Sequence, residues 1–354
     1  MNITGKPEDD ISMERKIIGI TMGDPSGIGP EVTVKALAKK SIYERCIPVV
    51  YGDEDPIKDA ISFCRTKQKL NIIQDPSEAK SEYGVIDLIP LNKVKFGDWD
   101  YKTVSSNSGD AAFTYILRAI KDAMDHKIDA VTTGPINKES LHMAGHFYSG
   151  HTEIFAEYTN TKKYAMLLTS KQLRVIHVTT HVPLRQACEM IKKERLLNVI
   201  KIADDAMKSI GIKKPRIAVA GLNPHASENG LFGDEEAKEI IPAVKEAQEQ
   251  GFNVEGPIPP DTVFVKAMGG QYDIVVAMYH DQGHIPLKLS GFKLNPKTGQ
   301  YVSMSGVNCT LGLPIIRTSV DHGTAFGKAG EGRANEESMI DAIDIAILMA
   351  ENRK

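Results

Sequence analysis

Short runs of apolar and β-branched residues alternate along the chain with longer segments in which apolar residues recur at helical spacing. The runs are nearly continuous rather than interrupted by polar residues, which is typical of strands buried on both faces. We predict strands at Ile17–Met22, Pro48–Tyr51, Val85–Ile89, Ala130–Thr133, Val175–Thr180, Ile217–Ala220 and Ile274–Met278. Because helical segments separate these strands, the pattern predicts an α/β architecture with a largely parallel sheet.

Two of the helical segments carry a clear apolar stripe. One follows Ser108 and Asp110, which are both suitable N-caps. Its stripe consists of Phe113, Ile116, Leu117, Ile120 and Met124. The other segment extends from Asn335 to the C-terminus, with a stripe of Met339, Ile340, Ile343 and Ile347. Residues 1–14, in contrast, are polar and aperiodic, and we expect a flexible tail there.

The composition is that of an ordinary globular protein and argues against several classes of function. A length of 354 residues suits two domains or one large α/β domain. The formal charge is -3 without a clustered basic face, so we expect no nucleic-acid partner. No apolar run could span a bilayer or serve as a signal peptide, so we expect a cytoplasmic protein with no membrane partner. The four cysteines form no CxxC pair, which argues against a disulfide framework or a thiolate zinc site.

Histidines follow three of the predicted strands, at His181, His225 and His280. Ligands of open parallel sheets bind at the carboxyl ends of the strands, so these side chains would reach one edge of the sheet. Three imidazoles bind a divalent metal and leave positions open for substrate or water. Such a metal could lower the pKa of a substrate hydroxyl and then polarise the resulting carbonyl. The spacing is not a metal signature, however, and each histidine could instead hydrogen-bond the backbone.

Two carboxylates lie near these histidines along the chain. Asp281 follows His280 directly, and Asp261 lies in a predicted turn at 259–262. Either carboxylate could orient a ligating imidazole or move a proton. Either could equally be a solvated or helix-capping group.

A second group of polar side chains is suited to binding phosphate or carboxylate. It consists of His151, Thr152, Lys288, Asn308 and Arg317. Arginine binds such anions through its bidentate fork. Arg317 ends the apolar run at 311–316, so we expect it away from the open surface, whereas Lys288 taken alone is typical of an exposed lysine.

Two glycine-rich stretches could bring their backbone close to a ligand. Gly23–Gly29 follows the first predicted strand but is neither GxGxxG nor a Walker loop. It could bind an anion through its N–H groups or form a structural turn. Residues 321–332 could form a ligand loop or an ordinary surface loop before the last helix.

Five motifs of the chain occur together in one known family. They are ITMGDPSGIGPE at 20–31, GHTE at 150–153, LNPH at 222–225, YHDQG at 279–283 and IRTSVDHGT at 316–324. With these motifs the chain resembles the 4-hydroxythreonine-4-phosphate dehydrogenase family of vitamin B6 biosynthesis, which has close relatives acting on phosphorylated four-carbon sugar acids. The resemblance spans nearly the whole chain from about residue 17 onward.

The resemblance implies roles for the residues singled out above. The family's three metal ligands match His181, His225 and His280, the last reaching the site from the other subunit of a homodimer. The substrate-contacting positions match His151, Thr152, Lys288, Asn308 and Arg317. The loop that resembles the adenosine side of an NAD or NADP site contains His322, Gly323, Thr324, Ala325 and Gly330. Candidates for catalytic proton transfer are Asp261, Asp281 and Lys288, and the choice among them stays open.

The implied fold resembles isocitrate and isopropylmalate dehydrogenases, with two α/β/α domains and an active site in a cleft at the dimer interface. We expect residues 15–140 and 305–354 to form a first, NAD-binding domain. Residues 141–304 would form the second domain, with the metal ligands and the dimer interface. The implied reaction is oxidation of a C3 hydroxyl by NAD and then β-decarboxylation, with one divalent metal (Zn, Mg, Mn or Co) as Lewis acid.

Three departures from the family pattern concern the substrate. Asn137 precedes Lys138, where the vitamin B6 branch typically has a histidine, and residues 174–181 look closer to the sugar-acid branch. Extra residues at 293–304 could cap the cleft or form a surface loop, and we favour the loop. We therefore favour 4-phospho-D-threonate or D-erythronate over 4-phosphohydroxy-L-threonine as the small phosphorylated hydroxy acid. A metal-dependent hydrolase and a non-catalytic metabolite-binding protein on the same fold are the alternatives.

Overall fold

The apolar runs of the chain form strands that are buried between layers of helices. The computed structural model describes residues 15–297 and 301–353, so the predicted tail at 1–14 lies outside the described residues. All seven predicted strands are present, and β5 (Ala130–Thr133) and β8 (Ile217–Ala220) have the predicted bounds. The strand predicted to end at Thr180 is β7 (Arg174–His177), which ends three residues earlier.

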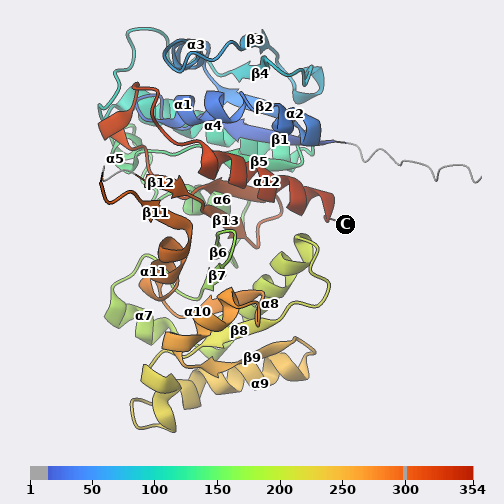
Figure 1. The fold of residues 1–354 in the computed structure, drawn as a ribbon, viewed down its shortest axis with the longest axis vertical. Helices are drawn as coiled ribbons and strands as arrows, with labels where there is room; N and C mark the ends of the chain where they lie inside the picture. Colours follow the sequence, from blue (N-terminus) through green and yellow to red (C-terminus); the bar gives the residue numbers. More distant parts are fainter. Residues whose placement is uncertain (1–14, 298–300, 354) are drawn as a thin grey trace, which may run out of the picture.

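The large sheet contains twelve strands in the order β3-β4-β2-β1-β5-β14-β13-β6-β7-β10-β8-β9, from top to bottom in Figure 1. The remaining strands of the chain are β1 (Lys16–Thr21), β2 (Cys46–Gly52), β3 (Lys69–Ile72), β4 (Val85–Pro90), β6 (Ala165–Thr169), β9 (Val254–Ile258), β10 (Ile274–Ala277), β11 (Phe292–Leu294), β12 (Tyr301–Met304), β13 (Val307–Leu311) and β14 (Ile316–Val320). Of these, β3, β6, β9 and β11 to β14 were not predicted.

Strand direction divides the sheet into two parallel halves. From β3 to β14 the neighbours are parallel, and so are the neighbours from β7 to β9. The three antiparallel pairings are β14–β13, β13–β6 and β6–β7, which all lie at the centre. The two halves therefore run in opposite directions, and their carboxyl ends lie at opposite edges of the sheet. The predicted α/β class with a largely parallel sheet is confirmed.

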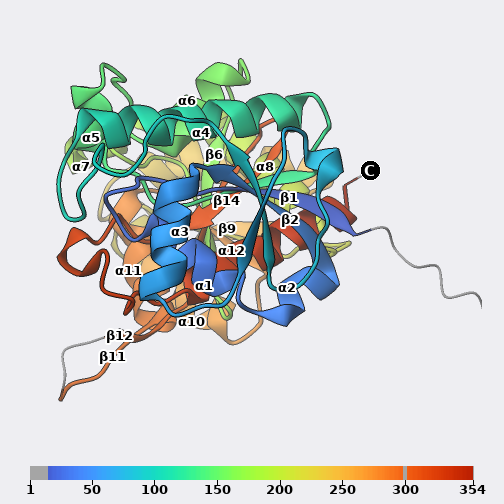
Figure 2. The same cartoon turned by 90° about the horizontal axis from the view of Figure 1, so that it is seen from above.

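Helices cover both faces of this sheet. The α-helices are α1 (Gly29–Ala36), α2 (Lys40–Arg45), α3 (Glu54–Phe63), α4 (Ser106–Met124), α5 (Lys138–Met143), α6 (His151–Tyr158), α7 (Leu184–Met190), α8 (Lys193–Ser209), α9 (Ile241–Glu249), α10 (Pro260–Met268), α11 (His280–Gly291) and α12 (Glu337–Glu351). Short 3₁₀ or π turns are η1 (Pro76–Glu78), η2 (Pro224–Glu228), η3 (Glu236–Ile240) and η4 (Phe326–Lys328). In the upper half, α4 and α6 lie on one face and α1 and α12 on the other (Figure 2).

The long helix α4 shows how the apolar stripe determines the buried face of a helix and how the N-cap determines where it begins. In α4, Phe113, Ile116 and Ile120 are buried as the stripe predicts, while the side chain of Met124 is exposed at the end of the helix. The predicted cap is wrong by one turn. Ser105 is the N-cap, and its hydroxyl accepts a hydrogen bond from the Ser108 N–H group.

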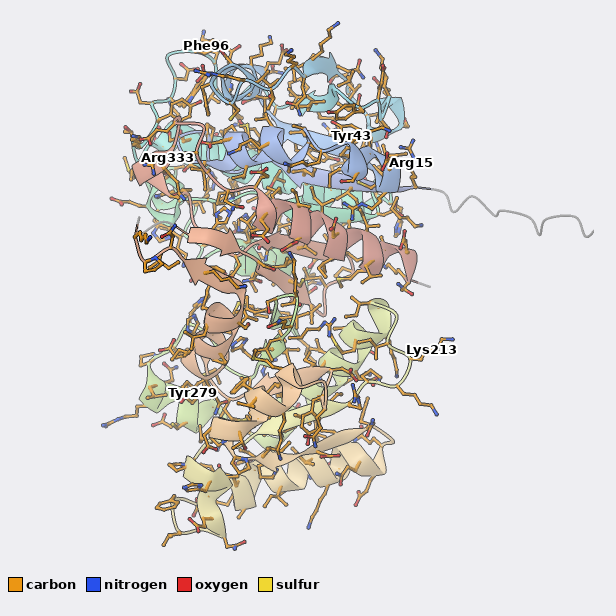
Figure 3. The ribbon with its side chains drawn as sticks, viewed as in Figure 1. Arg15, Tyr43, Phe96, Lys213, Tyr279 and Arg333 are labelled. Atoms are coloured by element: carbon orange, nitrogen blue, oxygen red, sulfur yellow. The ribbon has the colours of Figure 1, made fainter. Side chains whose placement is uncertain are left out.

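The predicted division into two domains stays a prediction, because one continuous sheet runs through both parts. Tyr279 belongs to the half built on β7 to β9, and Arg333 lies with the other half (Figure 3). The extra residues after 292 include an antiparallel β11–β12 hairpin that projects from the body in Figure 2, so this segment forms a hairpin where we expected a loop. Among the described residues no helix is long and apolar enough to cross a membrane.

Candidate active site

A polar cavity of about 290 Å³ lies over one face of the central strands. Asn308 on β13 is paired with Ser319 on β14, and Arg317 lies two residues before Ser319, so all three project to the same face. All three line the cavity, together with His151 and Thr152 at the start of α6. The structure thus brings together four of the five predicted anion-binding residues.

Arg317 is the most unusual side chain of the cavity, because the residue is only 2% exposed and no carboxylate forms an ion pair with it among the described residues. Its Nη1 and Nη2 donate to the hydroxyls of Thr310 and Thr133, at 3.1 and 2.8 Å, and its Nε has no partner in the described part of the chain. Burial lowers the pKa of Arg317 to about 10, so the side chain remains charged at neutral pH. A buried, unpaired cation is costly, which indicates that an anion binds here.

Other buried polar atoms at the cavity are also unsatisfied within residues 15–297 and 301–353. They are Nε2 of His151, Oδ1 of Asn308 and Nε2 of His322. Burial first, and the charge of Arg317 second, hold the pKa of His151 well below its usual range. The imidazole is therefore neutral at physiological pH and can donate or accept one hydrogen bond at each nitrogen. Thr152 contacts the same network through Thr310, with 3.1 Å between the two hydroxyl oxygens.

Lys288 reaches the cavity only through another residue. Its ammonium lies 2.5 Å from Oδ2 of Asp321 and 3.1 Å from the Asp321 carbonyl oxygen, over the ring of Phe292. Asp321 lines the cavity, whereas Lys288 does not. The sequence reasoning missed Asp321, although it directly follows the strand that carries Arg317. It also left Lys138 without a role, but this lysine lines the cavity after the end of β5.

The three predicted metal ligands follow three parallel strands, as expected. In the sheet β10 lies between β7 and β8, so His280 is placed between His181 and His225. The ring centroids of His181 and His280 are 5.7 Å apart. His284, which was not predicted, stacks on His280 at 3.6 Å and also lines the cavity.

The donor chemistry of these histidines fits a divalent metal, but one chain does not complete the site. The side chains of His181 and His225 are exposed. Within the described residues neither makes a side-chain hydrogen bond that metal binding would have to break. Nδ1 of His280 lies 2.6 Å from Oδ1 of Asp281, which leaves Nε2 free and orients the ring, as a metal ligand requires. Among residues 15–297 and 301–353, however, no group of three metal-binding side chains is assembled within one chain.

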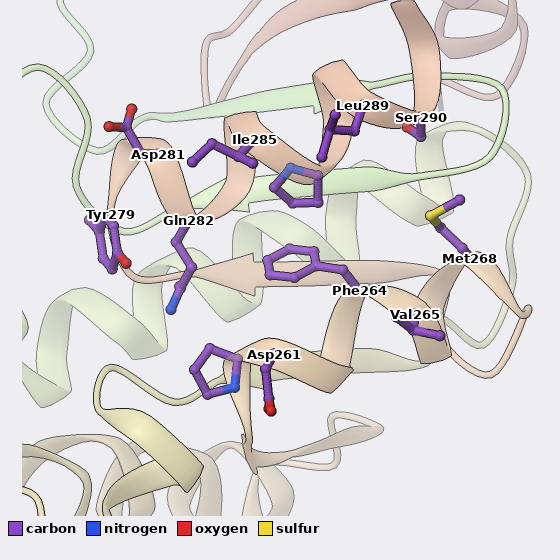
Figure 4. Close-up of a pocket in the computed structure, with 12 residues that line it drawn as sticks. Asp261, Phe264, Val265, Met268, Tyr279, Asp281, Gln282, Ile285, Leu289 and Ser290 are labelled. Atoms are coloured by element: carbon purple, nitrogen blue, oxygen red, sulfur yellow. The ribbon is translucent and has the colours of Figure 1, made fainter.

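The two predicted carboxylates lie on opposite sides of an apolar groove between α10 and α11. Asp261 is in the first turn of α10 rather than in a free turn, and Asp281 is in the first turn of α11. Between them the groove, about 540 Å³ in volume, is lined by Phe264, Ile285 and Leu289 (Figure 4). Asp281 thus contacts His280, whereas Asp261 faces the groove.

The predicted cofactor loop borders the cavity at one end. His322 and Gly323 line it, while Thr324 packs against the first glycine-rich stretch. The Thr324 carbonyl accepts the Ile28 N–H at 3.0 Å, and a Cβ on Gly27 would lie 2.8 Å from Cβ of Thr324. Gly27 is therefore required for close packing of the two loops, which favours the structural interpretation of the first stretch. Ala325 has a φ of 43°, and Gly330 packs against the ring of Tyr101. Cofactor binding by this loop stays a prediction.

Comparison with known proteins identifies relatives over almost the whole chain. Residues 44–346 match the family described as pyridoxal phosphate biosynthetic protein PdxA. A protein of Oceanobacillus iheyensis named "Putative D-threonate 4-phosphate dehydrogenase" is 49% identical over 95% of this chain and 98% of its own length. Crystal structures of 4-hydroxythreonine-4-phosphate dehydrogenases from Klebsiella pneumoniae and Burkholderia phymatum are 44% and 46% identical, with TM-scores of 0.83 and 0.81. Each covers 95% of this chain and 99% of the solved chain.

Proposed function

This chain belongs to the PdxA family of dehydrogenases, and from this premise we propose that it oxidises and then decarboxylates a 4-phosphorylated 3-hydroxy four-carbon acid. We place D-threonate 4-phosphate first, then D-erythronate 4-phosphate, and 4-phosphohydroxy-L-threonine as the alternative. The proposed hydride acceptor is NAD or NADP.

The single observation that carries this proposal is the buried charge of Arg317. Among the described residues no carboxylate pairs with its guanidinium, although Glu153 lines the same cavity and acts on Arg317 at longer range. His151 and Asn308 also have unsatisfied polar atoms there. Burying a cation without a paired anion is costly, and a ligand that supplies the paired negative charge would offset this cost. A phosphate or carboxylate group of the substrate would do so, with the bidentate geometry that arginine favours. Lys138, at the same cavity, would supply a second positive charge.

Two groups that the protein would bind supply the redox chemistry: nicotinamide accepts a hydride, and a divalent cation held by His181, His225 and His280 acts as Lewis acid and electron sink. Asp281 would keep the His280 ring in the ligating tautomer through its 2.6 Å contact with Nδ1. Lys288, fixed against Asp321 at the edge of the cavity, is the candidate for moving the hydroxyl proton. His322 and Gly323 would place the cofactor at the other end of the cavity.

We further propose that the active form is a homodimer joined through the α10–α11 groove. Large apolar side chains there are open to solvent in the single chain, with Val265 70% and Leu289 78% exposed. The groove runs up to Asp281, next to His280 (Figure 4). A second copy that covers it would bring its own residues to the histidines, which one chain does not complete as a metal site.

Residue 137 contributes to substrate choice only indirectly. The Asn137 side chain caps α5 by accepting the Ser140 N–H at 2.8 Å, and Asn137 does not line the cavity. It therefore fixes the start of α5, of which Lys138 is the first residue. The name of the Oceanobacillus relative supports the sugar-acid phosphate as first choice.

The test is NADH formation at 340 nm with each of the three acids, with and without added divalent metal and EDTA. Metal-dependent turnover with D-threonate 4-phosphate or D-erythronate 4-phosphate, and little with the amino acid, would support the proposal. The reverse preference would reassign the substrate. Loss of substrate without NADH would point to a hydrolase instead.

A further inference from the structure

The candidate metal ligand His225 lies on an unusual backbone. Five consecutive residues, 225–229, have φ between 44° and 72°, which is the left-handed region that residues other than glycine rarely adopt. Each such residue is strained, so a run of five persists only where surrounding contacts enforce it. The contacts that enforce this turn (residues 225–229) show how the chain places the exposed His225 ring.

Glu236 provides the main contact at the start of the turn. Its side chain is buried, 1% exposed, and makes no ion pair among the described residues. Oε1 accepts the N–H groups of Leu222 and Asn223 at 2.8 and 2.7 Å, and Oε2 accepts from Nδ2 of Asn223 at 2.8 Å. A buried carboxylate satisfied only by the two residues that precede Pro224 holds the entry to the turn in one position.

Two further contacts connect the turn to the rest of the site. A Cβ on Gly221 would lie 2.8 Å from Cα of Ala226, so the turn packs directly onto the end of β8. The Gly221 carbonyl accepts a 2.8 Å hydrogen bond from Nε2 of Gln282, whose Oε1 accepts the Met278 N–H at 2.6 Å. Gln282 therefore links the strand end that carries His225 to the helix start that carries His280.

We infer that Glu236 is a positioning residue for the metal site: it contacts neither metal nor substrate, and holds the left-handed turn so that His225 points where a cation can bind. The inference rests on the proposed function, because it assumes that His225 is a ligand. It assigns to Glu236 the role of a hydrogen-bond acceptor rather than of a charge.

The variants that test this role are Glu236→Ala, Glu236→Gln and Glu239→Ala, in the full-length protein. Alanine removes all three hydrogen bonds, whereas glutamine keeps an oxygen that can accept the two backbone N–H groups. Glu239 is the matched control, because it lies on the same π turn but pairs with Lys192 and the Lys193 N–H. The readouts are the Co²⁺ dissociation constant, measured by competition with a chelating dye, and the visible absorption spectrum of bound Co²⁺.

We expect Glu236→Ala to weaken Co²⁺ binding about 10- to 100-fold, the usual effect of removing a residue that supports a ligand. Glu236→Gln should stay within about threefold of wild type, since its oxygen can still accept both backbone hydrogen bonds. Glu239→Ala should bind Co²⁺ with the affinity of wild type. Equal affinity of Glu236→Ala and wild type, or equal losses in Glu236→Ala and Glu239→Ala, would overturn the inference.

Circular dichroism without metal shows whether each variant is folded. If Glu236→Ala does not fold, Gly221→Ala replaces it, because its methyl group displaces Ala226 while Glu236 stays intact. The same loss of affinity with Gly221→Ala supports the inference, and unchanged affinity overturns it. A wild-type protein that binds no Co²⁺ would instead refute the metal site of the proposed function, and the role of Glu236 with it.

Discussion

Replacing Arg317 with methionine should separate substrate binding from stability. Methionine has a similar length and can fill the space of the aliphatic stem, but it removes the buried charge. In the free protein the described contacts of that charge are hydrogen bonds to the hydroxyls of Thr133 and Thr310 and the face of the Phe155 ring, and no carboxylate pairs with it. We therefore expect R317M to fold and to be at least as stable as wild type, because an uncompensated buried cation is replaced by an apolar group.

The effect on activity follows from the contacts that a bound anion would lose. A hydrogen bond to a charged group contributes about 1.5–3 kcal/mol, and a bidentate pair about 3–6 kcal/mol. With about 1.4 kcal/mol for each factor of ten, kcat/KM should fall about 10²- to 10⁴-fold. Inorganic phosphate should raise the Tm of wild type by binding the folded state, and should leave the Tm of R317M unchanged.

The matched control is Arg195→Met, which removes a partly buried arginine outside the cavity. Arg195 donates to the Val178 and Tyr164 carbonyl oxygens, at 3.0 Å each. Its loss leaves these carbonyls unpaired, so R195M should lose about 1–3 kcal/mol of stability without a change in KM. Steady-state kinetics and thermal melts with and without phosphate are the assays. An R317M protein that melts well below wild type, yet keeps its KM, would refute the reasoning and make Arg317 a structural residue.

Three further variants test other parts of the site. Burial raises the pKa of Asp24 from 3.8 to about 6. The contribution of the protonated carboxyl to stability is therefore fully present below pH 3.8 and is lost as the pH rises through 6. At pH 8 the free energy of unfolding of Asp24→Asn should therefore exceed that of wild type by at most about 3 kcal/mol, and at pH 4 the two should be equal. No gain in stability at pH 8 would contradict this. Leu289→Glu places a charge in the α10–α11 groove and should give a monomer in sedimentation velocity, with activity lost; a dimer would place the interface elsewhere. Asp321→Asn removes the carboxylate that holds Lys288, so kcat should fall about tenfold with a shifted pH–rate profile and a nearly unchanged KM. A pure KM effect would instead assign Lys288 to substrate binding.

Strands could be predicted where they are buried on both faces, because such strands consist of continuous apolar residues. β5 reads AVTT and β8 reads IAVA, and both have the predicted bounds. The missed β13 and β14 read VNCTL and IRTSV: polar residues interrupt the first, and three consecutive polar residues occupy the middle of the second. Asn308, Arg317 and Ser319 of these strands line the cavity, so the strands that form the site are those whose pattern departs most from a buried strand.

The sequence predicted which residue types occupy the site but not which of these residues contact one another. Histidine at three strand ends and arginine after an apolar run are visible in the sequence. Whether Arg317 forms an ion pair, which it does not among the described residues, and which residue Lys288 pairs with depend on contacts between residues far apart or on different elements. The helix cap was misplaced for a different reason. Residues 105–110 read SSNSGD, and several of these side chains can cap a helix.

The change of strand direction at the centre of the sheet explains why the site is there. His181 follows the carboxyl end of β7, whereas Asp321 and His322 follow the carboxyl end of β14, and these two ends lie at opposite edges. All three nevertheless line one cavity. This is possible because the central strands are five residues long, or about 16 Å, so that a cavity over their face reaches both edges. Under the proposed function, the metal ligands would act from one edge and the cofactor from the other, with Arg317 on the face between them.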